Sequence, residues 1–461
     1  MKFFVRGGAE IAGLLLGAIA TIWISRIVGP SYFGYYAVML AVVTFGGLLI
    51  NAGLPTVGAQ FVANDPADAG EVVWTVTLVR VAFASVAVVG GFAALAVAPI
   101  APVLRGYLQI GLLLWALIPL SNGWILLAMG RVKAISALRV AGSVATLLTA
   151  LLLVQDISDA AHAPWVVVAG TVVNAAGTSY LTYRHSPARR PLAGTSRSAL
   201  VYLRSGVHAL KADISGFLFT SSDRLFLYVF ATPAIVGLYA AAYSVIQPFY
   251  MINVVVWDTM YLPVAQALGT DRLHATFRRY VDLMAFATVP VGFFLLAFAP
   301  TVISVLYGPT YAPASVYLAI LGWVITFGYT SGIAVMPFSA WNRQREYGNA
   351  TAVGGVLNVG LNFALIPMFQ AIGAAWATVA AKIVVTLAGI RYFNRVTNYP
   401  LVRDFAEYLA AAAAAYAAAL VGTTVWGFEA LVGMSLFALV YTVCIATVRL
   451  PRRLRLIGKS G

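Results

Sequence analysis

The length, composition and charge of the chain exclude a soluble globular protein. Hydrophobic residues make up 61% of its 461 positions and charged residues only 10%, whereas charged residues account for about 25% of an average soluble chain. The net charge of +14 does not indicate a nucleic-acid partner, because the basic residues lie between hydrophobic runs, where they determine membrane topology.

The hydrophobic runs have the length of about 20 residues that a helix needs to cross a bilayer. We therefore predict an all-α polytopic membrane protein with about 14 transmembrane helices. In chain order, the predicted helices cover residues 5–28, 34–55, 72–98, 107–129, 135–155, 163–183, 206–229, 233–257, 280–306, 313–336, 346–369, 372–392, 404–423 and 428–448.

The basic residues are unevenly distributed between the two sets of connections. With a cytoplasmic N-terminus, the cytoplasmic connections hold most of the arginines, including the run from Arg184 to Arg204. The opposite connections hold only Arg26, Arg105 and, at a helix end, Arg224. Because cytoplasmic loops are enriched in lysine and arginine, we predict that both termini are cytoplasmic. The outer connections are short, so no external catalytic domain is expected.

Several short motifs occur twice at a nearly constant offset. Gly34, Tyr36 and Ala37 correspond to Gly237, Tyr239 and Ala240, and Arg131 corresponds to Arg343. A repeat of this length predicts two six-helix lobes, residues 1–205 and 206–398, in the same orientation. They would be related by a pseudo-two-fold axis along the membrane normal. Residues 399–461 would add two helices, packed outside the lobes, and a basic cytoplasmic tail.

Charged residues inside the predicted helices are the candidates for function, because a charge at the bilayer centre costs about 2.5–3.5 kcal/mol. The basic candidates are Arg80, Arg139, Lys211 and Lys382. Arg139 and Lys211 lie near the cytoplasmic ends of their helices, where a side chain can also extend to the interface. Lys382 lies near the middle of its helix between Thr378 and Thr386, so we expect it to face a central cavity and contact an anion.

The acidic candidates are Glu10 and Asp213, on the first helix of each repeat. They would either balance the cations and couple transport to an ion, or form a structural ion pair. Six asparagines in apolar surroundings would line a cavity or hydrogen-bond between helices. They are Asn51, Asn122, Asn174, Asn253, Asn358 and Asn362. No metal-binding or catalytic motif stands out, so no cofactor, metal or enzymatic activity is expected.

Four segments resemble motifs of a known family. The run from Ile24 to Ala37 resembles the R-x-L-G-P-x-x-Y/F-G-x-Y turn of polysaccharide exporters, and Val236 to Ala240 repeats its end. The run from Leu306 to Tyr311 resembles their L-x-G-x-x-Y turn, and the segment from Asn358 to Ala375 their N-x-x-L-N-x-x-L-I-P segment. The chain thus resembles the multidrug/oligosaccharidyl-lipid/polysaccharide exporter superfamily, in its O-antigen and teichuronic acid flippase branch.

This resemblance implies a flippase that moves undecaprenyl-pyrophosphate-linked oligosaccharide across a prokaryotic inner membrane by alternating access. It would act as a monomer among membrane lipids, beside a polysaccharide polymerase or glycosyltransferase. The matched motifs do not include the family's substrate-contacting arginines, so Arg80, Lys211 and Lys382 are proposed from their depth alone. Two alternatives remain: a multidrug/cation antiporter of the same superfamily, and a membrane polysaccharide polymerase or ligase.

Overall fold

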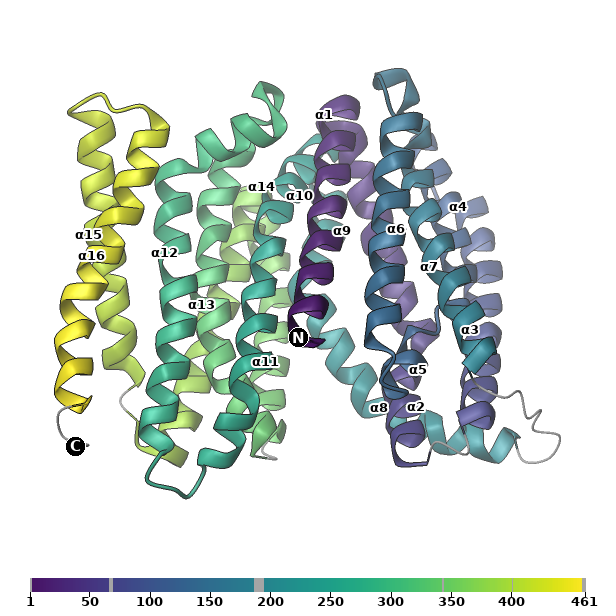
Figure 1. Ribbon diagram of the computed structural model, residues 1–461. Coiled ribbons are helices and arrows are strands. Elements are labelled where there is room, and N and C mark those ends of the chain that lie inside the picture. The colour runs from purple at the N-terminus through teal and green to yellow at the C-terminus, as the bar shows by residue number, and fades with distance from the viewer. Residues whose placement is uncertain (1, 66–68, 186–194, 342–343, 400, 458–461) are drawn as a thin grey trace. The chain divides into compact units, whose positions relative to one another are not determined.

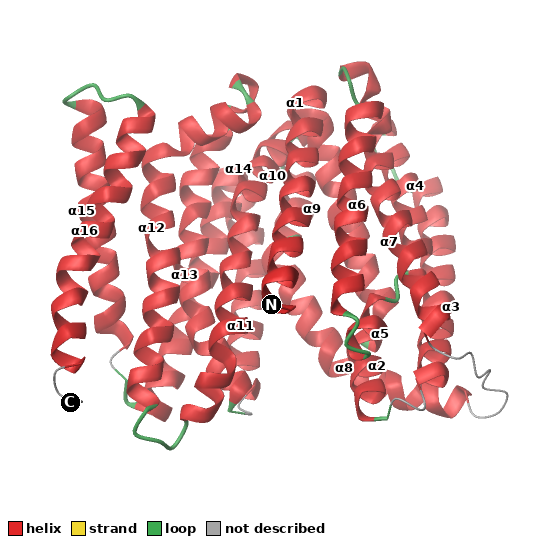
Figure 2. Cartoon of the chain, in the orientation of Figure 1, coloured by secondary structure: helices red, strands yellow, loops and turns green. Residues whose placement is uncertain are grey.

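The computed structural model describes residues 2–65, 69–185, 195–341, 344–399 and 401–457 (Figure 1). All regular secondary structure in these segments is helical, and none of it is a strand (Figure 2). The chain divides into two units, Met1–Ala240 and Ala241–Gly461. The domain boundary predicted between residues 205 and 206 stays a prediction.

The described residues of the first unit form nine α-helices and the start of a tenth. They are α1 (Lys2–Asn51), α2 (Leu54–Asn64), α3 (Ala69–Val97), α4 (Pro102–Leu117), α5 (Gly123–Ala128), α6 (Val132–Leu153), α7 (Ala163–His185), α8 (Thr195–Thr220), α9 (Ser222–Phe230) and α10 (Pro233–Ile246). Two 3-10 turns, η2 (Ile118–Leu120) and η3 (Ile157–His162), connect α4 to α5 and α6 to α7.

The second unit continues from the end of α10. It contains η4 (Gln247–Phe249), α11 (Tyr250–Ala267), α12 (Leu273–Tyr307), η5 (Pro309–Tyr311), α13 (Ala314–Ala340), α14 (Gln344–Thr397), α15 (Leu401–Thr424) and α16 (Ala430–Ile457). Over the described residues of both units, nine helical segments are long and apolar enough to span a membrane. The prediction of an all-α multi-pass membrane protein is therefore confirmed, while the number of 14 helices stays a prediction.

Two of these long segments are each two helices joined at a sharp break. In α1 the backbone of Gly29 has φ 75° and ψ 172°, and Pro30 begins the next helix. Glycine reaches this region without strain, and a residue before proline is disfavoured in the helical conformation. In α14 the break is at Gln370, which has φ 49°. The breaks predicted between residues 28 and 34 and between residues 369 and 372 are both confirmed.

Four other predicted helices were wrong in their continuity. The expected helix 34–55 ends at Asn51, where Ala52 and Gly53 both have positive φ. The expected helix 107–129 is divided by η2, which contains Pro119. Proline removes a backbone donor and disrupts the helix interior, and Pro248 in η4 accompanies the division of 233–257 in the same way. The expected helix 206–229 is divided at Ser221.

The start of the second half of α1 and the start of α10 cross at a pair of glycines. A Cβ atom built on Gly34 would lie 1.8 Å from the carbonyl oxygen of Pro233. A Cβ atom on Gly237 would lie 1.9 Å from the carbonyl oxygen of Pro30. Each glycine thus meets the proline that precedes the other glycine in its own helix. A two-fold axis produces such a reciprocal contact. It agrees with the repeat inferred from the sequence. Arg343 lies outside the described residues, so its match with Arg131 stays a prediction.

The last two helices, α15 and α16, pack against α12 of the second unit. The alanine-rich face of α15 lies against α12 and α16. The buried members of this cluster are Ala285, Val289, Phe298, Tyr408, Ala411, Ala412, Ala415, Ala419, Phe437, Tyr441 and Ile445. Small residues let helices approach closely in lipid, which accounts for the alanine-rich face at this contact. The expected position of these helices outside the two lobes stays a prediction.

Candidate functional site

Arg80, on α3, is held by oxygen atoms from breaks between helices. Its side chain is only 2% exposed. Its Nε atom donates to Oδ1 of Asn51 at 3.0 Å, and Nη1 donates to Oδ1 of Asn122 at 3.3 Å. Its Nη2 atom donates to the carbonyl oxygen of Ile118 at 2.5 Å. Longer hydrogen bonds of 3.4 Å join it to the carbonyl oxygens of Pro119 and Ser121.

The local sequence explains why these oxygens are available. The last carbonyl groups of a helix have no partner within the helix. Because Pro119 ends α4 as a 3-10 turn, the carbonyl oxygens of Ile118, Pro119 and Ser121 can accept from the guanidinium. Every described partner of Arg80 is a neutral oxygen, so its positive charge is not cancelled by a carboxylate.

A cavity of about 450 Å³ opens beside this guanidinium. Arg80 and the exposed Arg139 both line it, and Arg139 comes from α6. The polar residues around it are Asn51, Ser121, Ser136, Asn174 and Thr178. No acidic residue lines the cavity. Guanidinium groups donate bidentate hydrogen bonds to phosphate, so this cavity has the chemistry to hold an anion that also carries hydroxyl groups.

Arg80 lies at the depth expected from the sequence, but its depth did not indicate that Arg139 lines the same cavity. Arg139 lies near the end of its helix, where a side chain can also extend to the interface. Its neighbour one turn earlier, Ser136, is buried and lines the same cavity. This i, i+3 pair of polar residues on an apolar helix was the available signal. Two of the six asparagines, Asn51 and Asn174, line the cavity. Asn122 does not line it, but accepts from Arg80 and donates its backbone N–H to the Thr178 hydroxyl at 3.2 Å.

Lys382 lies on the second half of α14 and is half-buried. Its aliphatic chain passes Gly328 of α13, where a Cβ atom would lie 3.4 Å from its Cδ atom. One turn later, the Thr386 hydroxyl donates to the carbonyl oxygen of Phe327 at 2.6 Å. One turn earlier, Thr378 is fully buried. The two threonines of the expected cavity-lining face are thus packed between helices, and the role of Lys382 itself stays a prediction.

Thr378 belongs to a short row of buried polar groups in α14. Asn362 donates to Oδ1 of Asn358 at 3.1 Å, and Asn358 donates to the Thr378 hydroxyl at 3.4 Å. These bonds join the two halves of α14 across the break at Gln370. Of the two interpretations of these asparagines, interhelical hydrogen bonding holds here.

The remaining candidates lie apart from the Arg80 cavity. Lys211 and Asp213 are both exposed on α8, and neither lines a cavity described here. No ion pair joins either of them to a described residue. Glu10 lies on α1, but its side chain is outside the described ones. No cluster of metal-ligating residues occurs in the described parts of the chain.

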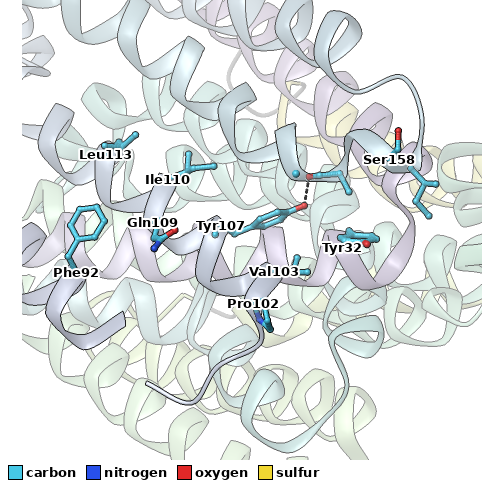
Figure 3. Close-up of a pocket in the computed structure, with 13 residues that line it drawn as sticks. Tyr32, Phe92, Pro102, Val103, Tyr107, Gln109, Ile110, Leu113 and Ser158 are labelled. Carbon is cyan, nitrogen blue, oxygen red and sulfur yellow. Dashed lines mark hydrogen bonds between the residues drawn. The ribbon is translucent and has the colours of Figure 1, made fainter. Parts of the chain in front are cut away.

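The first unit also contains a neutral cavity of about 690 Å³ that the sequence analysis did not predict. Tyr32, Phe92 and Tyr107 contribute aromatic walls, and Gln109 and Ser158 contribute polar groups (Figure 3). The Tyr107 hydroxyl donates to the carbonyl oxygen of Ala160 at 2.5 Å. With no charged residue in its lining, this cavity lacks the groups that hold an anion.

Comparison with known proteins places this geometry in a family. A family model described as polysaccharide biosynthesis protein matches residues 23–316. The chain belongs to the polysaccharide biosynthesis protein family. This confirms the resemblance to polysaccharide exporters drawn from the motifs.

The chain is similar in sequence to Agl15 of Haloferax volcanii, described as a probable low-salt glycan biosynthesis flippase. The two are 23% identical over 288 residues, which cover 62% of this chain and 59% of the relative. The matched region thus spans less than two thirds of the relative's length.

Two solved structures share the fold. The lipid II flippase MurJ in an inward closed conformation has a TM-score of 0.79 at 13% identity, covering 96% of this chain and 98% of that one. An inward-facing multidrug resistance transporter of the MATE family has a TM-score of 0.65 at 15% identity, covering 86% and 99%. At these identities the likeness shows the fold alone.

Proposed function

We propose that this polysaccharide biosynthesis protein is a flippase that moves lipid-linked oligosaccharide across the cell membrane. The observation that carries the proposal is the cavity beside Arg80 and Arg139, which combines two guanidinium groups with five neutral polar side chains in a membrane protein. A diphosphate joined to a sugar has the matching chemistry, with anionic oxygens for the arginines and hydroxyl groups for the amides and hydroxyls. Undecaprenyl pyrophosphate is the proposed carrier.

The two arginines would have different tasks. Arg80 is fixed by its oxygen partners and supplies a positive potential from beneath the cavity. Arg139 is exposed and belongs to the cavity wall, so it is proposed to contact the phosphate oxygens directly. Lys211 and Lys382 are proposed as further contacts along the route, and Glu10 and Asp213 as groups that balance charge or couple transport to an ion.

We propose that the protein acts as a monomer in the inner membrane of a prokaryote, with both termini cytoplasmic. The site moves its substrate without changing a covalent bond. A polysaccharide polymerase or glycosyltransferase would supply or consume the oligosaccharide. Family membership and the transporter fold support these proposals.

The test is a transport assay on purified protein in liposomes that contain a lipid-linked oligosaccharide. Flipping is measured as the fraction of sugar that an impermeant oxidant reaches over time. We expect Arg139→Gln to slow flipping about tenfold or more, because a hydrogen bond to a charged group contributes about 1.5–3 kcal/mol. Arg139→Lys should retain part of the rate. Lys382→Gln should also lower it, with partial retention in Lys382→Arg.

The matched control is Arg131→Gln. Arg131 is the exposed N-cap residue of the same helix and does not line the cavity. It should flip at the wild-type rate. If Arg139→Gln also flips at that rate, the assignment of the cavity is wrong. If wild-type protein flips no faster than protein-free liposomes, the flippase function itself is wrong.

A further inference from the structure

The end of α14 carries a hollow that has no part in the proposed transport site. Its volume is about 550 Å³. Six residues line it: Leu387, Ile390, Arg391, Asn394, Arg395 and Asn398. Their spacing of three and four residues places them on one face of the helix. The hollow therefore has an apolar start, at Leu387 and Ile390, and a polar end with two guanidinium and two amide groups.

The polar groups of this hollow are not engaged with the rest of the described structure. Neither Arg391 nor Arg395 has an ion pair or hydrogen bond there. Two other arginines of the second unit differ, since Arg449 contacts three carboxylates and Arg403 pairs with Glu407. Like charges four residues apart on a helix repel each other. An anion between Arg391 and Arg395 would remove that repulsion.

Asn394 provides a second, independent observation. Its Oδ1 atom is shielded from solvent and has no hydrogen-bond partner. Such buried acceptors are rare in folded proteins, because leaving one without a donor is unfavourable. The guanidinium groups can bind an anion, whereas this oxygen can only accept a hydrogen bond from a donor such as a hydroxyl group.

We propose that this hollow binds a phosphate ester that carries a hydroxyl group. The phosphate oxygens would accept from Arg391 and Arg395. The Asn394 side chain, which lines the hollow, would turn so that its amide oxygen accepts from the hydroxyl. The apolar start of the hollow, with Leu387 61% exposed, would contact the hydrocarbon part of a lipid. Arginines in the last turns of a helix also interact favourably with the helix dipole. In membrane proteins they are common at the cytoplasmic ends of helices. Those effects explain the charges but not the unpartnered amide oxygen.

The same chemistry occurs in the glycerol headgroup of an anionic lipid and in a water-soluble phosphate ester. The experiment separates these sources. Purified protein is titrated with phosphatidylglycerol, and bound lipid is counted by native mass spectrometry. A parallel series adds glycerol phosphate as a competitor. Displacement of the lipid shows that the ester group suffices, whereas its retention shows that the lipid chain is required; both results support the site.

The charge requirement is tested with Arg391→Gln/Arg395→Gln. We expect its affinity for phosphatidylglycerol to fall about tenfold or more. The matched control is Arg272→Gln/Arg279→Gln, which removes two exposed arginines of the same unit that do not line the hollow. Thermal unfolding should be unchanged in both variants, because all four side chains are exposed. Equal affinity in wild type and Arg391→Gln/Arg395→Gln, or an equal fall in the control, would overturn the proposal.

The hydroxyl requirement is tested with Asn394→Leu and a second lipid. Phosphatidylmethanol has the same phosphodiester charge as phosphatidylglycerol but no hydroxyl group. Wild type should prefer phosphatidylglycerol, and Asn394→Leu should remove this preference while still binding both lipids. An unchanged preference in Asn394→Leu contradicts the role of its amide oxygen.

Discussion

Two buried arginines of this chain illustrate two ways of holding a guanidinium group away from water. Arg80 is surrounded by neutral oxygens, and no described carboxylate cancels its charge. Arg449, on α16, contacts carboxylates of Asp282, Asp404 and Glu407 at 2.9, 3.2 and 3.2 Å. The first arrangement leaves a positive potential that a substrate can use. The second contains more acid than base, so its role is to hold helices together.

The acidic cluster also fixes the charge state of Arg449. Burial alone would lower its pKa, but the carboxylates, with Asp282 the strongest, raise the pKa above its ordinary value. The Tyr408 hydroxyl donates to Asp282 at 3.0 Å, and its ring lies 4.9 Å from the guanidinium carbon. Arg449 therefore stays charged at every accessible pH and links α12, α15 and α16.

We predict that Arg449→Gln destabilises the protein by about 3–5 kcal/mol, because removing one partner of a buried ion pair leaves carboxylates uncompensated. Arg403→Gln is the matched control. Arg403 lies 3.8 Å from Glu407, but its side chain is 73% exposed, and such a surface pair contributes about 0–1 kcal/mol. Chemical unfolding in detergent, followed by tryptophan fluorescence, measures both. Similar losses in the two variants would show that the cluster does not join these helices.

For single residues, depth in the membrane could be predicted from the sequence, but contact partners could not. The position of Arg80 about two turns inside an apolar helix made it a candidate for function. Its partners were not predictable, because most are backbone oxygens freed by the break at Pro119. Arg139 and Arg80 are 59 positions apart in the sequence, and depth in the membrane alone does not bring them together. The exposed positions of Lys211 and Asp213 depend on the packing of α8, which hydropathy does not encode.

At the scale of the helices, breaks with a local cause were predictable and breaks inside apolar runs were not. Gly29 and Pro30 interrupt α1 between two runs that are each long enough to span a membrane. Pro119, in contrast, lies within one continuous apolar run, so the average hydropathy predicted one helix. The positive φ of Ala52 has no signal in the residue type. The residues that accept from Arg80 lie at these two unpredicted breaks, with Asn51 at the first and the other four, from Ile118 to Asn122, at the second.

The crossing of α1 and α10 gives the clearest prediction at this scale. Gly34→Ala should destabilise the protein by about 1–3 kcal/mol, because overpacking at a close contact forces the backbones apart. Gly237→Ala should have a similar effect, since the two glycines meet reciprocally. The double variant should lose less than the sum, because neighbouring substitutions share one displacement.

The control for this contact is Gly90→Ala on α3. A Cβ atom on Gly90 would meet nothing within 4 Å. Alanine in a helix interior is favoured over glycine by about 0.5–1 kcal/mol, so this variant should be neutral or more stable. Thermal unfolding in detergent compares the variants. If Gly34→Ala is as stable as Gly90→Ala, the close contact between the two helices does not exist in the folded protein.

At the scale of the whole molecule, the central prediction is orientation in the membrane. Helix α6 decides it, because its 22 residues extend about 33 Å at 1.5 Å per residue. This matches the hydrocarbon thickness of about 30 Å. The two ends of α6 are therefore expected to lie on opposite sides. Arg131 precedes the helix and Lys133 lies in its first turn, whereas the connection after it holds Asp156 and Asp159 without any basic residue except His162. From the bias in lysine and arginine we predict that Arg131 lies on the cytoplasmic side.

Cysteine labelling tests this orientation directly, because Cys444 is the only cysteine of the chain. On a Cys444→Ala background, Arg131→Cys and Gln155→Cys each place one thiol at an exposed position beside α6. In intact cells, a membrane-impermeant maleimide should label Gln155→Cys, and it should label Arg131→Cys only after the membrane is permeabilised. The Cys444→Ala protein alone should stay unlabelled. The opposite pattern would invert the topology and place the N-terminus outside, and equal labelling of both variants in intact cells would mean that α6 does not cross the membrane.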